Sequence, residues 1–263
     1  MKKVIFLASI FFVISCSQKS VVPIPINNID TEKRILEEIK QQPEITAKVV
    51  EQIPFKKMDV LLSLGNGSNT ASAKFKYDIE YFGNGKIKTI KSDSKDMISI
   101  NYGTNQVSVN KGSTVDRYEL GNDNLAKNTV DGLQKYYYKN GYLSRVSGTA
   151  DFIIRNYSMA GNLIYLETDT QKSNYEYYDY SNNIRQEILK PESIHWGFRD
   201  DYLGRFSTNL LKKITFINST TSTITLDFTY RFDSNNRVSK MIIERNSSNF
   251  SVASGTIEYT FSY

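Results

Sequence analysis

The sequence ITLDFTYRFD, residues 224–233, decides the fold class of this chain. Apolar or aromatic side chains alternate in it with polar or charged ones at every second residue. Because successive side chains of a β-strand point to opposite faces, this period of two predicts a strand with one buried face and one face in water. Strands of that kind are typical of antiparallel sheets.

The same alternation recurs from about residue 60 to the end of the chain. Clear examples are KYDIEY at 76–81, ISINY at 98–102 and IEYTFSY at 257–263. Eighteen tyrosines and fourteen phenylalanines suit such a fold, because aromatic residues fit a pleated, half-buried surface. We expect a mainly β fold, a large antiparallel meander of about ten to fourteen strands that can roll into a barrel-like sheet.

Short turns separate these runs. Asn84-Gly85 and Asn140-Gly141 are strong hairpin signals, because both central residues of a two-residue hairpin turn must tolerate a positive φ angle. Gly161-Asn162, Asn182-Asn183 and Asn235-Asn236 are weaker signals of the same kind. We therefore expect the chain to reverse tightly at each of these dipeptides.

The chain opens with the pattern of an export signal. Lys2 and Lys3 precede an apolar run at 4–14, and Ser15 then precedes Cys16, the only cysteine. The run is shorter than the roughly 20 residues that a membrane-spanning helix needs. A basic start, a short apolar core and a small residue at the cleavage position are typical of a signal peptide. An ordinary secretory signal and a buried core helix are the alternatives, and neither explains the position of the cysteine.

The pattern Val13-Ile14-Ser15-Cys16 resembles the lipobox of Gram-negative lipoproteins. The resemblance implies that residues 1–15 are removed as a signal peptide. It also implies a diacylglyceryl thioether on Cys16 and a fatty acid on its new amino group. By the sorting pattern of such lipoproteins, Ser17 after the cysteine favours the outer membrane. Several acyl chains anchor a protein stably, whereas one chain anchors it only weakly.

Three further segments follow the signal. Residues 16–29 are expected to form a lipidated tether, in which prolines favour an extended chain. Residues 30–59 hold a short helix and a connecting segment, and residues 60–263 form one antiparallel β domain. Asp30 or Thr31 can cap the helix, which we expect to end near Gln41 and to pack on the sheet or plug one end of it. The apolar face of this helix comprises Ile35, Leu36 and Ile39.

An aromatic strand, a turn and an aliphatic strand form a loose repeat, as in YYYKNGYL at 136–143. This repeat resembles the tyrosine-aspartate repeats of Rhs-type proteins. Together with the lipobox, the segments 202–214 and 228–233 resemble more closely an uncharacterised family of Bacteroidetes-type outer-membrane lipoproteins with a porin-like β fold. The resemblance implies a fold and a location. It implies no activity and supplies no catalytic residue.

Few residues carry catalytic chemistry. His195 is the only histidine and no Gly-x-Ser-x-Gly motif accompanies it, so a Ser-His-Asp site is not indicated. One histidine and an acylated cysteine cannot supply the ligands of a zinc site. Asp200 and Asp201 could bind calcium or act as paired carboxylates, but a solvated loop is the simpler interpretation. We therefore expect no enzymatic activity, no metal and no other cofactor.

Aromatic side chains are the remaining candidates for a binding site. In the run Tyr136-Tyr137-Tyr138, alternation places at least one ring on the polar face. Tyr137, Tyr178 and Trp196 are therefore candidate ligand-binding aromatics, since exposed tyrosine and tryptophan are common anchors of binding surfaces. The alternative is that these rings form cross-strand pairs that stabilise the sheet.

These observations favour a non-enzymatic lipoprotein of the outer membrane that binds a glycan or an outer-membrane protein. The formal charge of +5 is spread among alternating basic and acidic residues, so a nucleic-acid partner is not expected. One alternative is an integral outer-membrane β-barrel, which the alternating strands and the terminal aromatic residue also suit. Most runs are shorter than the roughly 9–11 residues that its strands would need. A second alternative is a glycan-active hydrolase that uses His195 or the Asp200–Asp201 pair.

Overall fold

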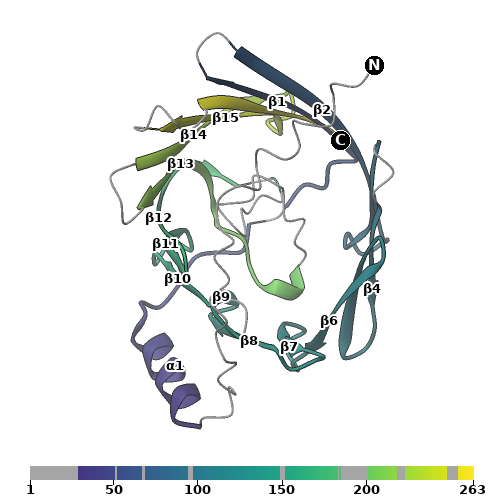
Figure 1. Ribbon diagram of the computed structural model, residues 1–263. Helices are drawn as coiled ribbons and strands as arrows, with labels where there is room; N and C mark the ends of the chain where they lie inside the picture. The colour runs from purple at the N-terminus through teal and green to yellow at the C-terminus, as the bar shows by residue number, and fades with distance from the viewer. Residues whose placement is uncertain are drawn as a thin grey trace.

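Sixteen β-strands form one closed antiparallel barrel (Figure 1) in the computed structural model, which describes residues 29–50, 52–66, 69–93, 97–148, 152–182, 184, 201–217, 223–247 and 254–263. Each strand pairs with its neighbours in the chain, and β1 pairs with β16 to close the barrel. The predicted mainly β fold is confirmed, and the sheet does close. The elements are α1 (Ile29–Gln41), β1 (Lys57–Asn66), β2 (Asn69–Tyr81), β3 (Ile87–Ser92), β4 (Met97–Tyr102), β5 (Gln106–Lys111), β6 (Thr114–Leu120), β7 (Ala126–Thr129), β8 (Gln134–Lys139), β9 (Tyr142–Gly148), β10 (Ile153–Tyr157), β11 (Leu163–Thr168), β12 (Lys172–Ser181), η1 (Asp201–Leu203), β13 (Asn209–Ile217), β14 (Thr223–Phe232), β15 (Val238–Ser247) and β16 (Ser254–Ser262).

The barrel holds more strands than the sequence pattern predicts. Two additional turns are centred on glycines that lack a neighbouring asparagine signal. Gly112 joins β5 to β6 with a φ of 58°, and Gly132 lies between β7 and β8 with a φ of 72°. Glycine reaches positive φ at no steric cost, so it can reverse the chain without the asparagine that the prediction relied on.

The two ends of the barrel differ, and we call them the turn end and the loop end. At the turn end the chain enters β1, leaves β16 and makes the short connections that follow β2, β4, β6, β8, β10 and β14. The turn end also holds the long connection between β12 and β13. The loop end holds the connections that follow the other strands.

Four of the five expected tight turns are confirmed, and all four lie at the turn end. A positive φ occurs at Gly85 (77°), Asn140 (51°), Gly161 (76°) and Asn236 (58°). These values match the left-handed conformation that a short hairpin turn needs. The local chemistry of glycine and asparagine was therefore sufficient to place these reversals.

Asn182-Asn183 does not join β12 to β13 as a tight hairpin, because β12 ends at Ser181 and β13 begins only at Asn209; Asn183 itself lies outside the described residues. Asn182 instead holds a long connection in place. Its backbone N–H donates to the carbonyl oxygen of Thr208 at 2.7 Å, and its side-chain amide donates to that of Ser207 at 2.9 Å. Asn182 therefore binds residues 207 and 208, which lie about 25 positions further along the chain.

The wall of the barrel is uneven in height. The strands β12 to β16, β1 and β2 are neighbours in the barrel and have 9 to 13 residues each. We call them the tall arc. The nine strands from β3 to β11 have 4 to 7 residues each and form the short arc.

Helix α1 lies outside the ring of strands, beside β8 (Figure 1). Its Ile35 and Ile39 are buried together with Tyr137 of β8, so the helix packs on the outer face of the sheet. The predicted helix and one of its two expected positions are confirmed. Leu36, also assigned to the apolar face, stays 45% exposed, because it lies off the line that Ile35 and Ile39 form one turn apart.

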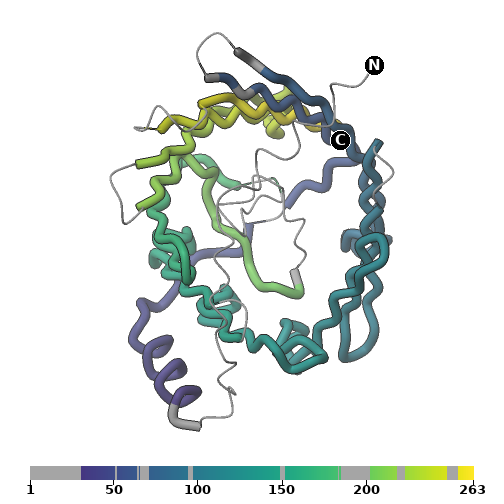
Figure 2. Tube along the Cα trace, viewed as in Figure 1, coloured from purple at the N-terminus to yellow at the C-terminus, as the bar shows by residue number. Residues whose placement is uncertain are grey.

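After α1 the chain crosses the turn end to reach β1, as the trace in Figure 2 shows. We call residues 42–50 and 52–56 the strap. The backbone N–H of Thr46 donates to Met159 in the β10–β11 turn at 3.0 Å, and that of Lys56 donates to Ser262 of β16 at 2.7 Å. Between these points, the Gln52 side chain donates to the carbonyl oxygen of Asn182 at 2.9 Å. The strap is therefore fastened to the turn end along its course.

Residues 201–208 cover a further part of the turn end from the inside. The backbone N–H of Arg205 donates to Gly141 at 2.8 Å, which ties the segment to the β8–β9 turn. The ring of Tyr202 lies 5.2 Å from that of Tyr118, whose side chain belongs to the core. In Figure 1 this light green segment lies within the ring of strands. Strap and segment are therefore both fastened to the β8–β12 side of the turn end.

Candidate functional site

The strand register shows which side chains point into the barrel. Met58 of β1 pairs with Phe261 of β16 and Tyr77 of β2, and all three belong to the core. Two residues further along β1, Val60 pairs with Tyr259 and Phe75. Because side chains alternate along a strand, the residues between them, such as Asp59, point outward. In these strands the apolar face that the sequence pattern predicts to be buried is the one that faces the lumen.

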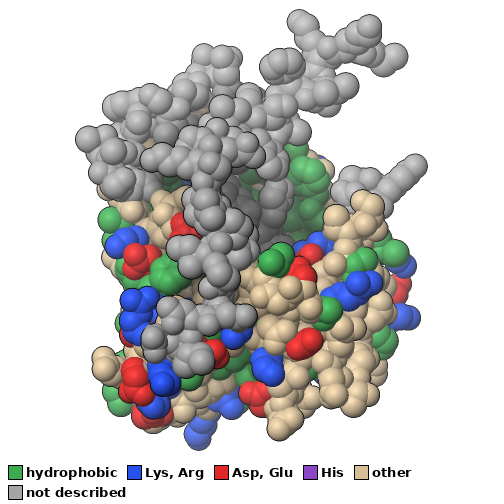
Figure 3. Space-filling view, turned by 60° about the horizontal axis from the view of Figure 1, so that its bottom comes forward, with side chains coloured by type: hydrophobic (Ala, Val, Ile, Leu, Met, Phe, Trp, Pro, Cys, Tyr) green, Lys and Arg blue, Asp and Glu red, His purple; other side chains and the backbone are tan. Residues whose placement is uncertain are grey.

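The burial of these inward side chains changes along the barrel. Near the turn end they are almost fully covered: Met58 is 1% exposed and Tyr259 is 2% exposed. Towards the loop end the burial is mixed: Ile257 and Phe216 stay 3% exposed, whereas other inward side chains of the tall arc and Ile98 of β4 are half-buried. We call this region the loop-end lumen, and it comprises Val60, Leu62, Ala73, Phe75, Ile98, Ile224 and Arg245. Figure 3 shows hydrophobic side chains at the upper end of the molecule, beside the residues drawn in grey.

Arg245 is the charged side chain of the loop-end lumen. The register places it between Leu226 of β14 and Gly255 of β16, one row above the buried pair Phe228 and Ile243. Removal from water lowers the pKa of Arg245, since burial disfavours the charged form. Within the described part of the chain, no hydrogen bond or ion pair holds its guanidinium.

Other charged groups that face the interior are paired or more deeply placed. On the short arc, Lys111 forms an ion pair of 2.9 Å with Asp116. Arg155 of β10 is 1% exposed and is in register with Leu166 of β11, which is also fully buried. Arg245 differs from all of these, because it combines a half-buried position with an apolar surrounding.

The outer wall is rich in charge. Cross-strand ion pairs join Lys57 to Asp78, Lys213 to Asp227 and Lys240 to Glu258. Figure 3 shows basic and acidic side chains interspersed over the outer surface in view. Each such pair contributes little to the stability of the fold. Their presence does indicate that the outer surface is in contact with water.

A further outer pair, between Lys91 and Glu80, shifts the pKa values of both its members. Lys91 donates to Glu80 at 2.8 Å. This hydrogen bond lowers the pKa of the Glu80 carboxyl and raises the pKa of the Lys91 ammonium. Both groups are therefore charged over the whole neutral range, as expected for a wall in contact with water.

Tyr137 points outward, as alternation required, but helix α1 covers its ring. It is 9% exposed and contacts Ile35 and Ile39. Burial raises the pKa of Tyr137, the charge of Glu32 adds to that effect, and Arg145 opposes it. With the helix in place, this ring does not offer a stacking surface, and its role as a ligand-binding residue stays a prediction.

Tyr178 belongs to an aromatic cluster at the turn end. Its hydroxyl donates to the carbonyl oxygen of Phe228 at 2.9 Å, and its ring lies 5.9 Å from Tyr180 and 6.1 Å from Tyr230. Tyr180 in turn contacts Phe232 at 5.9 Å. This arrangement agrees with the alternative interpretation of cross-strand pairs. Sequence reasoning did not single out Tyr180, which at 60% exposure is the most accessible ring of the cluster.

The remaining predicted site residues lie outside the described residues. They are Cys16, Trp196, His195 and Asp200. In the described segments, no three histidine, cysteine, aspartate or glutamate side chains gather closely enough to hold a metal ion. No helix of the described chain has the length and apolar character needed to cross a membrane.

Sequence reasoning missed Arg245, although the signal was present. Ile243 and Arg245 have the same parity along β15, so alternation places both on the inner face. A lone arginine near the end of an apolar run is easily taken for the polar margin of a strand. Only the pairing with Gly255 shows that the side chain lies within the lumen wall.

Comparisons with known proteins bear on the fold. No protein-family model and no curated protein matches the sequence. A solved structure similar to this chain is that of a porin-like protein from Bacteroides uniformis, with 16% sequence identity and a TM-score of 0.57. The match covers 80% of this chain and 99% of that protein. The chain therefore has a porin-like antiparallel β-barrel fold. The lipoprotein and Rhs-type parts of the expected resemblance stay predictions.

Proposed function

We propose that this chain is a non-enzymatic, lipid-anchored barrel of the outer membrane whose wall faces water and whose loop-end lumen binds an apolar molecule. The observation that carries the proposal is the contrast between the two faces of the wall. Its inner face is apolar and includes half-buried side chains at the loop end, whereas its outer face carries paired charges. Each methylene that leaves water for such a surface contributes about 0.8 kcal/mol.

The outer wall supports a water-facing position. A membrane-spanning barrel has an apolar outer band about 25 Å tall and a polar interior, which is the opposite of the arrangement here. Lys76, Asp227 and Glu244 lie away from the ends of tall strands, and Asp227 and Lys76 are outward by the register. A lysine at the middle of the bilayer costs about 2–4 kcal/mol.

Strand length supports the same position. A spanning strand needs roughly 9–11 residues. The tall arc meets this length, but the nine strands of the short arc, at 4 to 7 residues each, do not. A bilayer would therefore meet a wall tall enough on only one side of the barrel.

An integral outer-membrane barrel is the second candidate. The likeness to a porin-like protein and the length of the tall strands favour it. In that case the barrel itself, and not a lipid on Cys16, would hold the protein in the membrane. The two candidates thus differ in what removal of the lipid does.

Carbonate extraction of membranes that carry the full chain with Cys16→Ala separates the two candidates. Recovery of the variant in the soluble fraction, with the unaltered chain retained in the membrane, supports the anchored, water-facing barrel. Retention of both proteins after extraction would instead establish the integral barrel and overturn the proposal.

The lumen is tested with a matched pair of leucines in β1. Leu62 points into the loop-end lumen and its neighbour Leu61 points outward, while both are half-buried. We expect the fluorescent apolar probe N-phenyl-1-naphthylamine to bind the full chain and Leu61→Glu, and to bind Leu62→Glu at least about tenfold more weakly. A circular-dichroism melt of both variants checks folding, and Leu62→Gln repeats the test without a charge. Equal binding by the inward and outward variants would rule the lumen out.

A further inference from the structure

We infer that the ligand of the loop-end lumen is an amphiphile with an anionic head, which Arg245 binds while the apolar chain lies against the inner wall. The inference rests on the proposed function and adds the chemical class of the ligand. Its first basis is position: Arg245 points into the lumen from β15, between Leu226 and Gly255 in the register.

The second basis is that, among the residues the structure describes, no acidic side chain forms an ion pair with Arg245. Acidic residues do occur nearby, but Glu244 is the neighbour of Arg245 in the chain, and Asp227 follows Leu226, so alternation directs both to the outer face. Asp227 is moreover paired with Lys213. A guanidinium stays charged at every physiological pH, so a half-buried one is stabilised when an anion supplies the missing charge and hydrogen bonds.

The third basis is the shape of the wall around this cation. Gly255 has no side chain, so the residue that pairs with Arg245 in β16 places no side chain against the guanidinium. On the other side, Leu226 and the half-buried Ile224 continue the apolar surface along β14. A cation with an adjoining apolar wall matches a molecule that has a charged head and a hydrocarbon chain.

A carboxylate and a phosphate both suit this cation, because the planar guanidinium can donate two parallel hydrogen bonds to either group. A free fatty acid offers the first and a lipid phosphate the second. Their shared chemistry is an anionic head on an acyl or alkyl chain. The test therefore compares the two heads directly, at one chain length.

The experiment uses the full chain with Cys16→Ser, so that no acyl group of its own can enter the lumen. Dodecanoate, dodecyl phosphate and the neutral 1-dodecanol each displace N-phenyl-1-naphthylamine in a fluorescence titration. We expect at least one of the two anions to bind about tenfold more tightly than 1-dodecanol, because a charge-assisted hydrogen bond adds to the burial of the chain. Tighter binding of dodecanoate points to a fatty acid, and tighter binding of dodecyl phosphate to a lipid phosphate.

The variant Arg245→Gln should abolish this preference for the anion and leave the binding of 1-dodecanol unchanged. Arg231→Gln is the matched control, since Arg231 is an exposed arginine of the neighbouring strand β14. Arg245→Lys keeps the charge and should keep part of the preference, which covers the case that the glutamine variant does not fold.

The possible failures are distinguishable. Equal binding of all three compounds, unaffected by Arg245→Gln, would overturn this inference and leave the apolar lumen standing. No binding of any compound, together with no effect of Leu62→Glu on the naphthylamine probe, would overturn the proposed function and this inference with it.

Discussion

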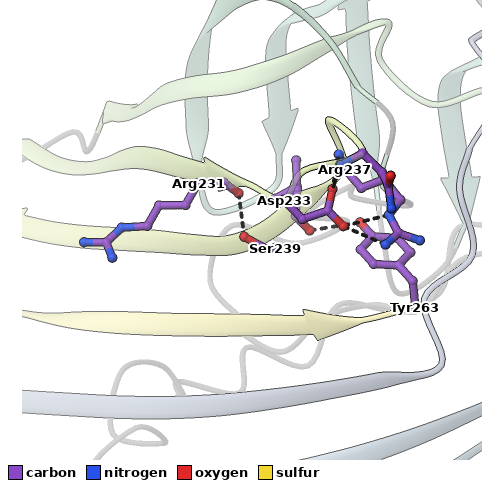
Figure 4. A network of polar contacts seen from close by, with 7 residues as sticks. Arg231, Asp233, Arg237, Ser239 and Tyr263 are labelled. Atoms are coloured by element: carbon purple, nitrogen blue, oxygen red, sulfur yellow. Dashed lines mark hydrogen bonds and ion pairs between the residues drawn. The ribbon is translucent and has the colours of Figure 1, made fainter.

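The guanidinium of Arg237 lies 4.3 Å above the ring centre of Tyr263, the last residue of the chain (Figure 4). Arg237 also donates from Nε (2.8 Å) and Nη2 (2.7 Å) to one carboxylate oxygen of Asp233. The Tyr263 hydroxyl donates to the carbonyl oxygen of Val238 at 2.9 Å. These contacts bind the β14–β15 turn to the chain terminus, beside the seam where β16 pairs with β1. The hydrogen bonds from Arg237 also hold the pKa of the Asp233 carboxyl below its usual range.

We expect Arg237→Ala to lower the free energy of unfolding by about 1–2 kcal/mol. The change removes a cation–π contact and a charge-assisted hydrogen bond, and it leaves Asp233 without its partner. Urea denaturation followed by circular dichroism measures the loss. The control is Arg231→Ala, because Arg231 is exposed and its backbone carbonyl, not its side chain, accepts the hydrogen bond from Ser239. If both variants lost the same free energy of unfolding, the contact between Arg237 and Tyr263 would contribute nothing to stability.

Alkaline pH should destabilise the barrel through two tyrosines. Burial raises the pKa of Tyr263 to about 12 and that of Tyr118 to about 12. A tyrosine in the unfolded chain titrates near pH 10, so the folded chain keeps these two protons to a higher pH than the unfolded chain does. Their stabilising contribution is complete below about pH 10 and is lost as the pH rises towards 12. Ultraviolet titration near 295 nm should show Tyr263→Phe and Tyr118→Phe each removing a late-titrating phenol; loss of an early one instead would contradict the assignment.

Docking of α1 should depend on one face of the helix. Ile39→Asp places a charge against Tyr137 and the underlying strand. We therefore expect the free energy of docking to become less favourable by about 2–4 kcal/mol, so that the helix leaves the wall. Leu36→Asp lies on the same helix at an exposed position and should leave α1 in place. Hydrogen–deuterium exchange of residues 29–41 reports docking, with fast exchange expected only in the Ile39 variant. Protection that survives in both variants would mean that the ion pairs Glu32–Lys135 and Glu38–Arg145 suffice.

Gly161 should be intolerant of a side chain. A Cβ atom there would lie 2.5 Å from the Tyr142 hydroxyl oxygen and 2.8 Å from the Cβ of Ala47 in the strap. Its φ of 76° adds conformational strain, and together we expect Gly161→Ala to cost about 2–4 kcal/mol in the free energy of unfolding. Gly85→Ala isolates the strain, because Gly85 has a φ of 77° but no atom within 4 Å of the added Cβ. If thermal melts gave the same shift for Gly161→Ala and Gly85→Ala, the strap would be shown to move aside with no loss of stability.

Much of the wall could be predicted from the sequence. The alternation in residues 224–233 identifies a strand and its buried face, and both are observed in β14, where Leu226 and Phe228 are buried. The asparagine-glycine turns were equally predictable. Both signals are local, since the pleat repeats every two residues and turn geometry depends on adjacent φ angles.

The candidate site could be predicted only in part. Alternation allowed the outward direction of Tyr137 to be foreseen, but not the helix that covers it, because α1 and β8 are about a hundred residues apart in the chain. The same holds for Asn182, whose turn-forming chemistry is used by the distant Ser207 and Thr208. Each outcome depends on a contact between segments that no local pattern connects.

The sequence by itself determined that this chain forms antiparallel strands with one apolar face, where four of the hairpins turn, and that a short helix precedes the sheet. The tertiary structure alone decided that β1 meets β16, that the apolar face lines a lumen, and that Arg245 stands in that lumen beside Gly255. The physical reason is the range of the interactions. Alternation and turn preference act within a few residues, whereas barrel closure and the surroundings of a side chain depend on the register between strands from opposite ends of the chain.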